Sequence, residues 1–488
     1  MRDRPEVRTA SGVVRGEWTG GVAVFRGIPY ARPPVGARRF AAPVPALSWD
    51  GVREAAEFGP SVPQAGCAGA DSGDCLTLNV WSPDLGPARL PVLVWIHGGA
   101  YREGGSSNPH HDGTLLAAAG AVMVTLNYRT GFEGFAHITG APDNRGILDQ
   151  AAALRWVQDQ VAVFGGDPGT VTVFGQSAGA GSVAALLAMP MAAGLFRRAI
   201  AQSVPGTYFT PDLAAAVSAS IAAEVGVRAD VDELTRITPR ALVDATDAMV
   251  RRMPEFVDSW GPMALTPTPF SPVVDGDVLP DTPWRALAHG TAHDIDLLVG
   301  HTRDEYRLFN TRRGDTVSDA ELATTFGRLA PGIDYRTAFP GATNAELYET
   351  VNADWLFRMP SVRLADAHSV GGGRTRLYEL CWSFRQDQGA SHSLDVLLVF
   401  GTLGVTEVRA HPRAHPDAAE ELTAVGDAMR ADWLAFATTG DPGWAPYDSR
   451  SRTTRVYTGV PETQPYPEEP SRRIWALHPF APLDLRSS

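Results

Sequence analysis

The sequence contains no lysine, so all 42 of its basic residues are arginines. This absence excludes the mechanisms that need a lysine amine: a Schiff base with a carbonyl substrate, the lysine of a phosphate-binding loop, and a Ser-x-x-Lys acylation dyad. A nucleophilic serine in this chain would need another activating base, and histidine is the usual one.

Cysteine is also scarce, with only Cys67, Cys75 and Cys381 in the chain. An odd number of cysteines without an apolar N-terminal signal segment predicts reduced thiols, although Cys67 could pair with Cys75. The run His110-His111-Asp112 lies in a stretch rich in Pro, Gly and Ser and has no fourth ligand at a metal-binding spacing. We therefore expect a solvated loop there, and neither a metal nor another cofactor.

The chain has no excess of positive charge and no long apolar run. Its net charge of −13 and pI of about 5.4 argue against nucleic acid and anionic membrane surfaces as partners. No segment approaches the roughly 20 apolar residues that a membrane span needs. We expect a cytoplasmic protein and leave its oligomeric state open between a monomer and a homodimer.

Apolar runs and helical periodicity alternate in the first half of the chain. Buried strands are predicted at residues 90–96, 121–126 and 171–174, and a helix at 149–163. Residues 11–30 predict antiparallel strands around a Gly20-Gly21 turn. Strands that alternate with helices indicate an α/β protein with a mostly parallel central sheet flanked by helices.

Two later stretches have helical patterns without strand signals. They predict helical insertions at about 207–265 and 312–370, over the carboxyl edge of the sheet, where α/β proteins bind ligands. We find no linker or repeat, so residues 1–488 are predicted to form a single domain. Further elements are expected as helices at 319–329, 344–366 and 424–439 and as strands at 295–299 and 376–381.

The most informative motif is Gly175-Gln176-Ser177-Ala178-Gly179, which follows the apolar run 171–174 and precedes a helical pattern of small residues. A Gly-x-Ser-x-Gly turn between a strand and a helix is typical of a nucleophile elbow, in which the serine hydroxyl stands above the sheet. The helix N-terminus supplies free N–H groups for a developing oxyanion.

A second glycine turn follows the strand predicted at 90–96, in the sequence His97-Gly98-Gly99-Ala100-Tyr101. A glycine pair directly after a buried strand lets backbone N–H groups face a ligand. We expect Gly99, Ala100 and Ala178 to form an oxyanion hole; an ordinary tight turn is the alternative.

A base and an acid are needed to complete the site. In hydrolases with a nucleophile elbow the chain order is serine, acid, histidine, which leaves the histidines after residue 177. His392 lies in a loop just after the strand predicted at 376–381, where the base is required. The strand predicted at 295–299 leads into Asp304 and Glu305, and spacing alone does not choose between these two carboxylates.

Taken together, these motifs resemble the type-B carboxylesterase/cholinesterase family of α/β hydrolases, in particular its bacterial members. The resemblance extends over nearly the whole chain. It rests on residues 25–36 (FRGIPYARPPVG), 74–80 (DCLTLNV), 95–101 (WIHGGAY), 127–129 (NYR), 148–157 (LDQAAALRWV), 164–168 (FGGDP), 196–203 (FRRAIAQS), the elbow, and the segments around residues 305 and 392.

The resemblance implies an α/β-hydrolase fold and a Ser177–His392–Glu305 triad, since Glu305 and His392 match the family's acid and base. Gly99, Ala100 and Ala178 match its oxyanion donors. Tyr101, Gln176 and Phe132 are expected to line the substrate pocket. Family members usually have a glutamate before the nucleophile, whereas this chain has Gln176. The missing negative charge argues against a preference for cationic ester substrates.

The expected activity is hydrolysis of small neutral carboxylic esters through an acyl-enzyme on Ser177. An acyltransferase or cyclase that uses the same triad with an alcohol as acceptor is an alternative. A binding module of the same fold without catalytic activity is another, because this fold is not tied to one function.

Overall fold

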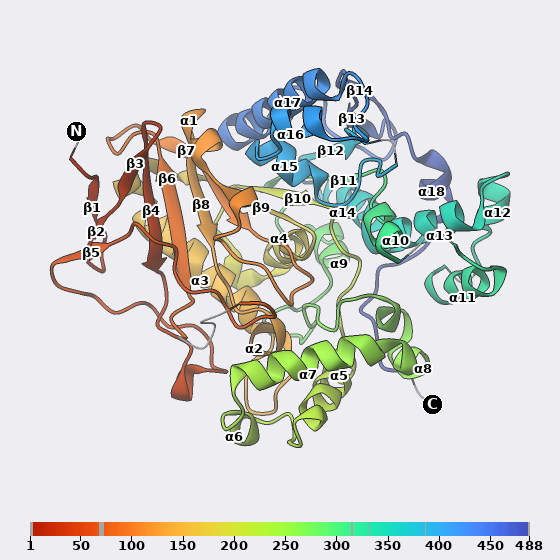
Figure 1. Cartoon of the computed structure of the whole chain (residues 1–488), viewed down its shortest axis with the longest axis horizontal. Helices are drawn as coiled ribbons and strands as arrows, with labels where there is room; N and C mark the ends of the chain where they lie inside the picture. The colour runs from red at the N-terminus through yellow and green to blue at the C-terminus, as the bar shows by residue number, and fades with distance from the viewer. Residues whose placement is uncertain (1–2, 68–72, 314–315, 331, 386, 487–488) are drawn as a thin grey trace. The chain divides into compact units, whose positions relative to one another are not determined.

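The computed structural model describes residues 3–67, 73–313, 316–330, 332–385 and 387–486 (Figure 1). The chain forms two compact units. The first unit consists of Met1–Arg198, Thr207–Thr282 and Pro482–Ser488, and the second consists of Ala199–Gly206 and Pro283–Ala481.

The first unit contains a sheet with the strand order β9-β7-β8-β6-β4-β3. Strand β7 runs parallel to both β8 and β9, whereas β6, β4 and β3 are joined in antiparallel pairs. A second sheet of this unit has the order β1-β2-β5. The strands are β1 (Glu6–Arg8), β2 (Val13–Arg15), β3 (Glu17–Thr19), β4 (Val22–Pro29), β5 (Val52–Glu54), β6 (Thr77–Ser82), β7 (Leu90–Ile96), β8 (Val122–Leu126) and β9 (Gly166–Gln176).

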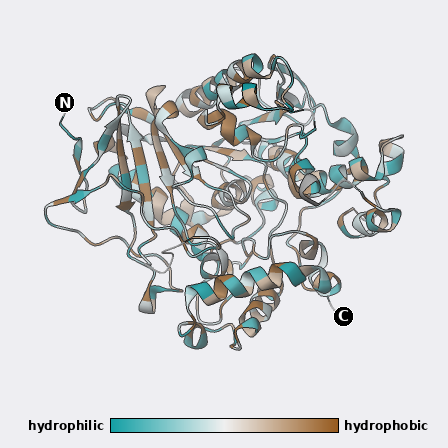
Figure 2. Cartoon of the chain, in the orientation of Figure 1, coloured by the Kyte–Doolittle hydropathy of each residue, from teal (hydrophilic) through white to brown (hydrophobic). Residues whose placement is uncertain are grey.

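Helices of the first unit include both buried and amphipathic ones. The small residues of α4 are all buried, and α4 packs on β9 and α3. Helix α7 buries Leu242, Ala245, Thr246 and Met249 and mixes hydrophilic and hydrophobic residues along its length (Figure 2). The helices are α1 (Thr114–Ala118), α2 (Gly131–Phe135), α3 (Arg145–Gln160), α4 (Ala178–Ala188), α5 (Pro211–Glu224), α6 (Val231–Leu234), α7 (Pro239–Arg252) and α8 (Val257–Trp260).

In the second unit the strand order is β14-β13-β12-β11-β10. Strands β11, β12 and β13 are parallel, and β14 is antiparallel to β13. The strands are β10 (Arg198–Gln202), β11 (Asp296–Thr302), β12 (Thr375–Leu380), β13 (Thr453–Tyr457) and β14 (Glu462–Pro465). The helices are α9 (Pro283–Ala288), α10 (Arg307–Arg313), α11 (Asp319–Leu329), α12 (Tyr335–Ala338), α13 (Asn344–Ala353), α14 (Met359–Val370), α15 (Leu394–Phe400), α16 (Val405–Ala410), α17 (Ala418–Thr439) and α18 (Glu469–Ile474).

The helix predicted at 344–366 is wrong in one respect, because it is not a single α-helix. A π-helical turn, Asp354–Arg358, separates α13 from α14, and Pro360 lies in the first turn of α14. Proline has no N–H to continue the ladder of α-helical hydrogen bonds. The carbonyl of Leu356 accepts instead from the N–H of Gly206, at 2.8 Å.

A buried carboxyl lies in the second unit on β12. Glu379 pairs in register with His301 of β11, and neither of its carboxyl oxygens has a hydrogen-bond partner in the part of the chain that the structure describes. Burial, reinforced by the nearby charge of Glu468, raises the pKa of Glu379 to about 8. An ionised carboxylate in this position would be neither solvated nor hydrogen-bonded, so the protonated form is favoured.

This raised pKa makes the stability of the protein depend on pH. The unfolded chain ionises Glu379 near its ordinary value of 4.5, whereas the folded protein keeps the proton up to about pH 8. Between these values the group lowers the free energy of unfolding by up to about 1.4 kcal/mol for each pH unit of increase. Glu379→Gln is a neutral variant and should escape this loss.

We expect the melting temperature of Glu379→Gln to exceed that of the unaltered protein by a margin that grows from pH 5 to pH 8, measured by calorimetry or circular dichroism. Glu420→Gln, the same change at an exposed position of α17, is the matched control. A margin for Glu379→Gln that stays constant with pH would contradict the raised pKa.

Candidate active site

Ser177 lies at the turn between β9 and α4 in the first unit. Its backbone adopts φ 58° and ψ −125°, a strained conformation for a residue other than glycine. Ser177 is partly exposed, whereas its neighbours in sequence are buried. A strained, accessible serine between a strand and a helix is the local geometry of a nucleophile elbow.

The two glycines of the motif are required by close packing. A Cβ at Gly175 would lie 2.6 Å from the backbone of Gly179, and one at Gly179 would lie 2.1 Å from the carbonyl oxygen of Ile96. Side chains at either position would therefore push α4 away from β7 and β9. The lack of space for a Cβ at these two positions therefore explains why the motif has glycine on both sides of Ser177.

The turn expected to form the oxyanion hole lies against the elbow within the first unit. A Cβ at Gly98 would be 3.1 Å from the Cβ of Ser177. Gly99 has φ +122° and Ala100 has φ +55°, and the carbonyl of Gly99 accepts from the N–H groups of Arg102 and Glu103 at 2.9 and 3.0 Å. The turn is thus fixed by its own hydrogen bonds.

The expected oxyanion donors have no competing acceptor. Within the described part of the chain, the N–H groups of Gly99, Ala100 and Ala178 donate to no backbone or side-chain acceptor. N–H groups left free at a helix N-terminus and a glycine turn can stabilise an oxyanion with little reorganisation.

His97 directly precedes this turn in sequence and packs beside it. Its ring stacks on Tyr128 with centroids 4.4 Å apart, and its Nδ1 lies 2.8 Å from the carbonyl oxygen of Gly98. Burial lowers the pKa of His97 to about 4, so the ring is neutral at pH 7. The Tyr128 hydroxyl also donates to the carbonyl of His97, at 2.7 Å.

Gly99→Ala should disturb these donors. The new Cβ would lie 2.1 Å from the carbonyl oxygen of Glu103, at a φ that disfavours alanine. We expect kcat/KM for p-nitrophenyl acetate to fall by about 10²-fold or more, the usual cost of losing one oxyanion donor. Gly120→Ala is the matched control, because Gly120 also has positive φ (+103°) but has open space around it. Equal activities of the two variants would contradict the role of this turn.

Glu305 and His392 lie in the second unit, on loops that follow β11 and β12. The distance between Nδ1 of His392 and Oε2 of Glu305 is 2.5 Å. The N–H of Thr302 donates to Oε1 of Glu305 at 2.9 Å. The side chains of Glu305 and His392 are 0% and 7% exposed, so water screens their interaction little.

The charge state of Glu305 follows from its partners. Burial is the largest single influence and opposes ionisation, but the charge and hydrogen bond of His392, together with smaller contributions from Ser203 and His301, lower the pKa of Glu305. A carboxylate that accepts the Nδ1–H of His392 leaves Nε2 of the ring as the proton acceptor. Asp304 does not take this role; its side chain accepts from the N–H of Ala390 at 2.8 Å.

Two aromatic side chains pack on the ring of His392. Phe357 stacks on it with centroids 4.3 Å apart and an interplanar angle of 29°, and Phe309 lies at 5.7 Å. Phe357 belongs to the π-helical turn Asp354–Arg358. Sequence reasoning missed Phe357, because neither the helical periodicity nor the motifs of this segment mark it. The only local signal is Pro360, which interrupts the helical ladder.

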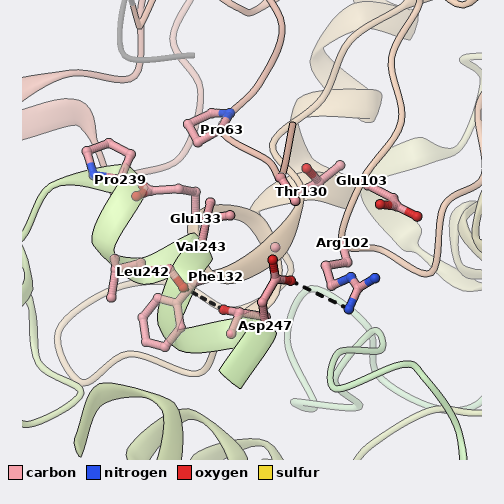
Figure 3. A pocket seen from close by; sticks show the side chains of 13 residues that line it. Pro63, Arg102, Glu103, Thr130, Phe132, Glu133, Pro239, Leu242, Val243 and Asp247 are labelled. Atoms are coloured by element: carbon pink, nitrogen blue, oxygen red, sulfur yellow. Dashed lines mark hydrogen bonds and ion pairs between the residues drawn. The ribbon is translucent and has the colours of Figure 1, made fainter. Parts of the chain in front are cut away.

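The residues expected to line the substrate pocket are also in the first unit. A pocket there is bounded by the loop after the glycine turn, by α2 and by α7 (Figure 3). Of the expected residues only Phe132 lines this pocket; Tyr101, Gln176 and Ser177 are not among its lining residues, and Arg102 and Asp247, which are, lie 3.7 Å apart. Tyr101 packs on Phe135 at 4.7 Å. Gln176, at the end of β9, is 4% exposed.

Other predictions from sequence have clear outcomes. The solvated loop predicted at His110-His111-Asp112 is wrong for His111, which is 9% exposed and packs on Trp95 at 5.1 Å. Cys67, Cys75 and Cys381 are all free thiols. None of the helices that the structure describes combines the length and hydropathy that crossing a bilayer requires.

This chain is similar to known proteins of one family over most of its length. The model of the carboxylesterase family matches residues 3–331. The para-nitrobenzyl esterase of Bacillus subtilis (strain 168) is 37% identical over 499 aligned residues, which cover 96% of this chain and 97% of that protein. The fumonisin B1 esterase of Sphingopyxis macrogoltabida is 34% identical, covering 89% of this chain and 82% of that protein.

Solved structures give the same result. The crystal structure of Geobacillus stearothermophilus carboxylesterase EST55 at pH 6.2 matches with a TM-score of 0.85 and 36% identity, covering 97% of this chain and 100% of that one. A para-nitrobenzyl esterase structure matches with a TM-score of 0.84. The predicted α/β-hydrolase fold, with a large, mostly parallel sheet flanked by helices, is confirmed. The chain belongs to the carboxylesterase family and is a carboxylic ester hydrolase.

Proposed function

We propose that the chain hydrolyses small, neutral carboxylic esters through an acyl-enzyme on Ser177, with His392 as base and Glu305 as the acid that orients it. The observation that carries this proposal is the buried contact of 2.5 Å between Nδ1 of His392 and Oε2 of Glu305. A histidine held in this way has one fixed tautomer, in which Nε2 is the ring nitrogen that can accept a proton. The proposal requires Nε2 of His392 to reach the Oγ of Ser177, which the other unit carries.

In the first half-reaction, Oγ of Ser177 attacks the ester carbonyl while His392 takes the hydroxyl proton at Nε2. The N–H groups of Gly99, Ala100 and Ala178 stabilise the oxyanion of the tetrahedral intermediate. This intermediate collapses when His392 returns the proton to the leaving alcohol. In the second half-reaction, water attacks the acyl-enzyme with His392 again as base, and the carboxylic acid and free Ser177 are released.

The preference for neutral esters rests on Gln176. This residue directly precedes Ser177 and is 4% exposed, so a carboxylate at the same position would place a charge beside the nucleophile with little screening. The neutral amide removes that attraction for a cationic substrate. Hydrolysis of an uncharged ester should therefore be favoured over that of a quaternary ammonium ester of equal length.

The test of this function is to identify both the modified residue and the products. A fluorophosphonate probe should add one covalent mass to the peptide that contains Ser177, and ester turnover in water with an added alcohol should yield mainly the free acid. Labelling of another residue would refute the nucleophile. If transfer to the alcohol dominated over hydrolysis, the enzyme would be an acyltransferase.

A further inference from the structure

Asp304 and Glu305 are adjacent carboxylates at the end of β11, and they make different contacts. Glu305 contacts the ring of His392, whereas Asp304 contacts the backbone that leads to it. Two loops must stay in register for the contact between Glu305 and His392, because one follows β11 and the other follows β12. A group that joins the loops next to both residues would hold this register.

Asp304 joins the two loops through both its backbone and its side chain. Its N–H donates to the carbonyl of Ala390 at 3.0 Å, and its Oδ2 accepts from the N–H of the same residue at 2.8 Å. Asp304 also pairs with Ser391 as an isolated parallel bridge. Ala390 lies two residues before His392, and Asp304 lies one residue before Glu305. We call these contacts of Asp304 with Ala390 and Ser391 the clasp; in sequence they lie directly before both Glu305 and His392.

The packing of the loop depends on the Asp304 carboxylate. Gly389 has φ +58°, and a Cβ there would lie 2.3 Å from Oδ2 of Asp304 and 2.4 Å from an Nη of Arg307. The positive φ and this close approach to the carboxylate both favour glycine at position 389. The loop before His392 is therefore fitted to the Asp304 side chain as well as hydrogen-bonded to it.

Arg307 fixes the carboxylate in turn. Its guanidinium lies 2.9 Å from Oδ1 of Asp304 and 2.9 Å from Oε1 of Glu349 on α13. The side chains of Asp304 and Glu349 are 16% and 14% exposed, so the three groups are partly shielded from water. Because Arg307 occupies Oδ1, Oδ2 is left to accept from Ala390. The clasp is tied to a helix outside both loops.

We propose that Asp304 is a positioning residue for the reaction, which fixes the loop of His392 and so sets the Nδ1–Oε2 contact with Glu305. This inference rests on the proposed function, because it needs His392 to be the base. Asp304 acts on the reaction only through the loop. Misplacement of a catalytic group by about 1 Å can cost about 10²-fold in rate, so the effect should appear in kcat.

The test compares variants by turnover per active site, counted with a fluorophosphonate titration of Ser177. Asp304→Ala removes both the acceptor for Ala390 and the ion pair with Arg307, and should lower kcat per titrated site by about 30- to 100-fold with KM nearly unchanged. Asp304→Asn keeps an acceptor oxygen for Ala390 and should lose less than about 5-fold. Gly389→Ala pushes the loop away from an intact Asp304 and should resemble Asp304→Ala.

Two outcomes would overturn the inference. If Asp304→Ala reduced the number of titratable sites but kept a normal kcat per site, Asp304 would be needed only for folding. If Asp304→Asn lost as much as Asp304→Ala, the charge and not the hydrogen bond to Ala390 would matter. Failure of the proposed function looks different, because the unaltered protein would then not be labelled at Ser177.

Discussion

Ser177→Ala should abolish the turnover of p-nitrophenyl acetate, with a loss in kcat on the order of 10⁶-fold, as expected when the nucleophile of a triad is removed. The variant has no oxygen at position 177 to attack the ester, and it should not react with a fluorophosphonate. The measurements are initial rates of p-nitrophenol release and the mass of the protein after exposure to the probe.

The stability of this variant should be nearly unchanged. The backbone at position 177 is strained for alanine as much as for serine, and Ser177 is partly exposed, so removing its hydroxyl deletes little buried contact. The melting temperature should therefore stay within a few degrees of that of the unaltered protein, which rules out unfolding as the cause of the loss. Ser107→Ala, at an exposed serine of the same unit, should keep full activity. Activity retained in Ser177→Ala would refute the nucleophile.

Local sequence predicted the elbow well, because its constraints are local. A Cβ at Gly175 would lie 2.6 Å from the backbone of Gly179, four residues along the chain, and the apolar run before the motif forms the buried strand β9; the contact of Gly179 with Ile96 of β7 is the one long-range constraint on the motif. The same holds for the glycine turn after β7. Where a motif and its packing share one cause, a single sequence carries enough information to place the residues.

Sequence reasoning failed where distant segments decide the outcome. The composition around His111 predicted solvent, but the ring packs on Trp95, which is brought there by β7. The periodicity of residues 344–366 continues through the π-helical turn and gives no sign of it. Phe357 in this turn contacts His392, which comes from a different segment of the chain. No pattern within either segment encodes such a contact.

The choice between Asp304 and Glu305 shows the same limit. Two adjacent carboxylates after a strand are equivalent to any argument from spacing, and only the resemblance to a family favoured Glu305. In the structure their environments differ completely. Glu305 is fully buried against His392, while Asp304 lies in a network with Arg307 and the backbone of Ala390.

Glu305→Gln should lower kcat by about 10⁴-fold, and the reason lies in the contacts of the carboxylate with Thr302 and His392. Oε1 accepts from the N–H of Thr302, and Oε2 faces Nδ1 of His392. A glutamine must place its single acceptor oxygen at Thr302, so its NH₂ group faces Nδ1. That donor forces the proton of His392 onto Nε2, the wrong tautomer for a base, and the charge that stabilises the imidazolium is lost as well.

The rate of fluorophosphonate labelling at Ser177 should fall together with kcat, because both depend on the same base. Glu305→Asp keeps two acceptor oxygens and the charge, so its loss should be smaller than that of the amide even though its side chain is shorter. Glu407→Gln makes the identical chemical change at an exposed position of α16 and should leave both kcat and the labelling rate unchanged. A folded Glu305→Gln protein that lost less than about 10-fold in kcat would show that another group orients His392, since a wrong tautomer cannot sustain that rate.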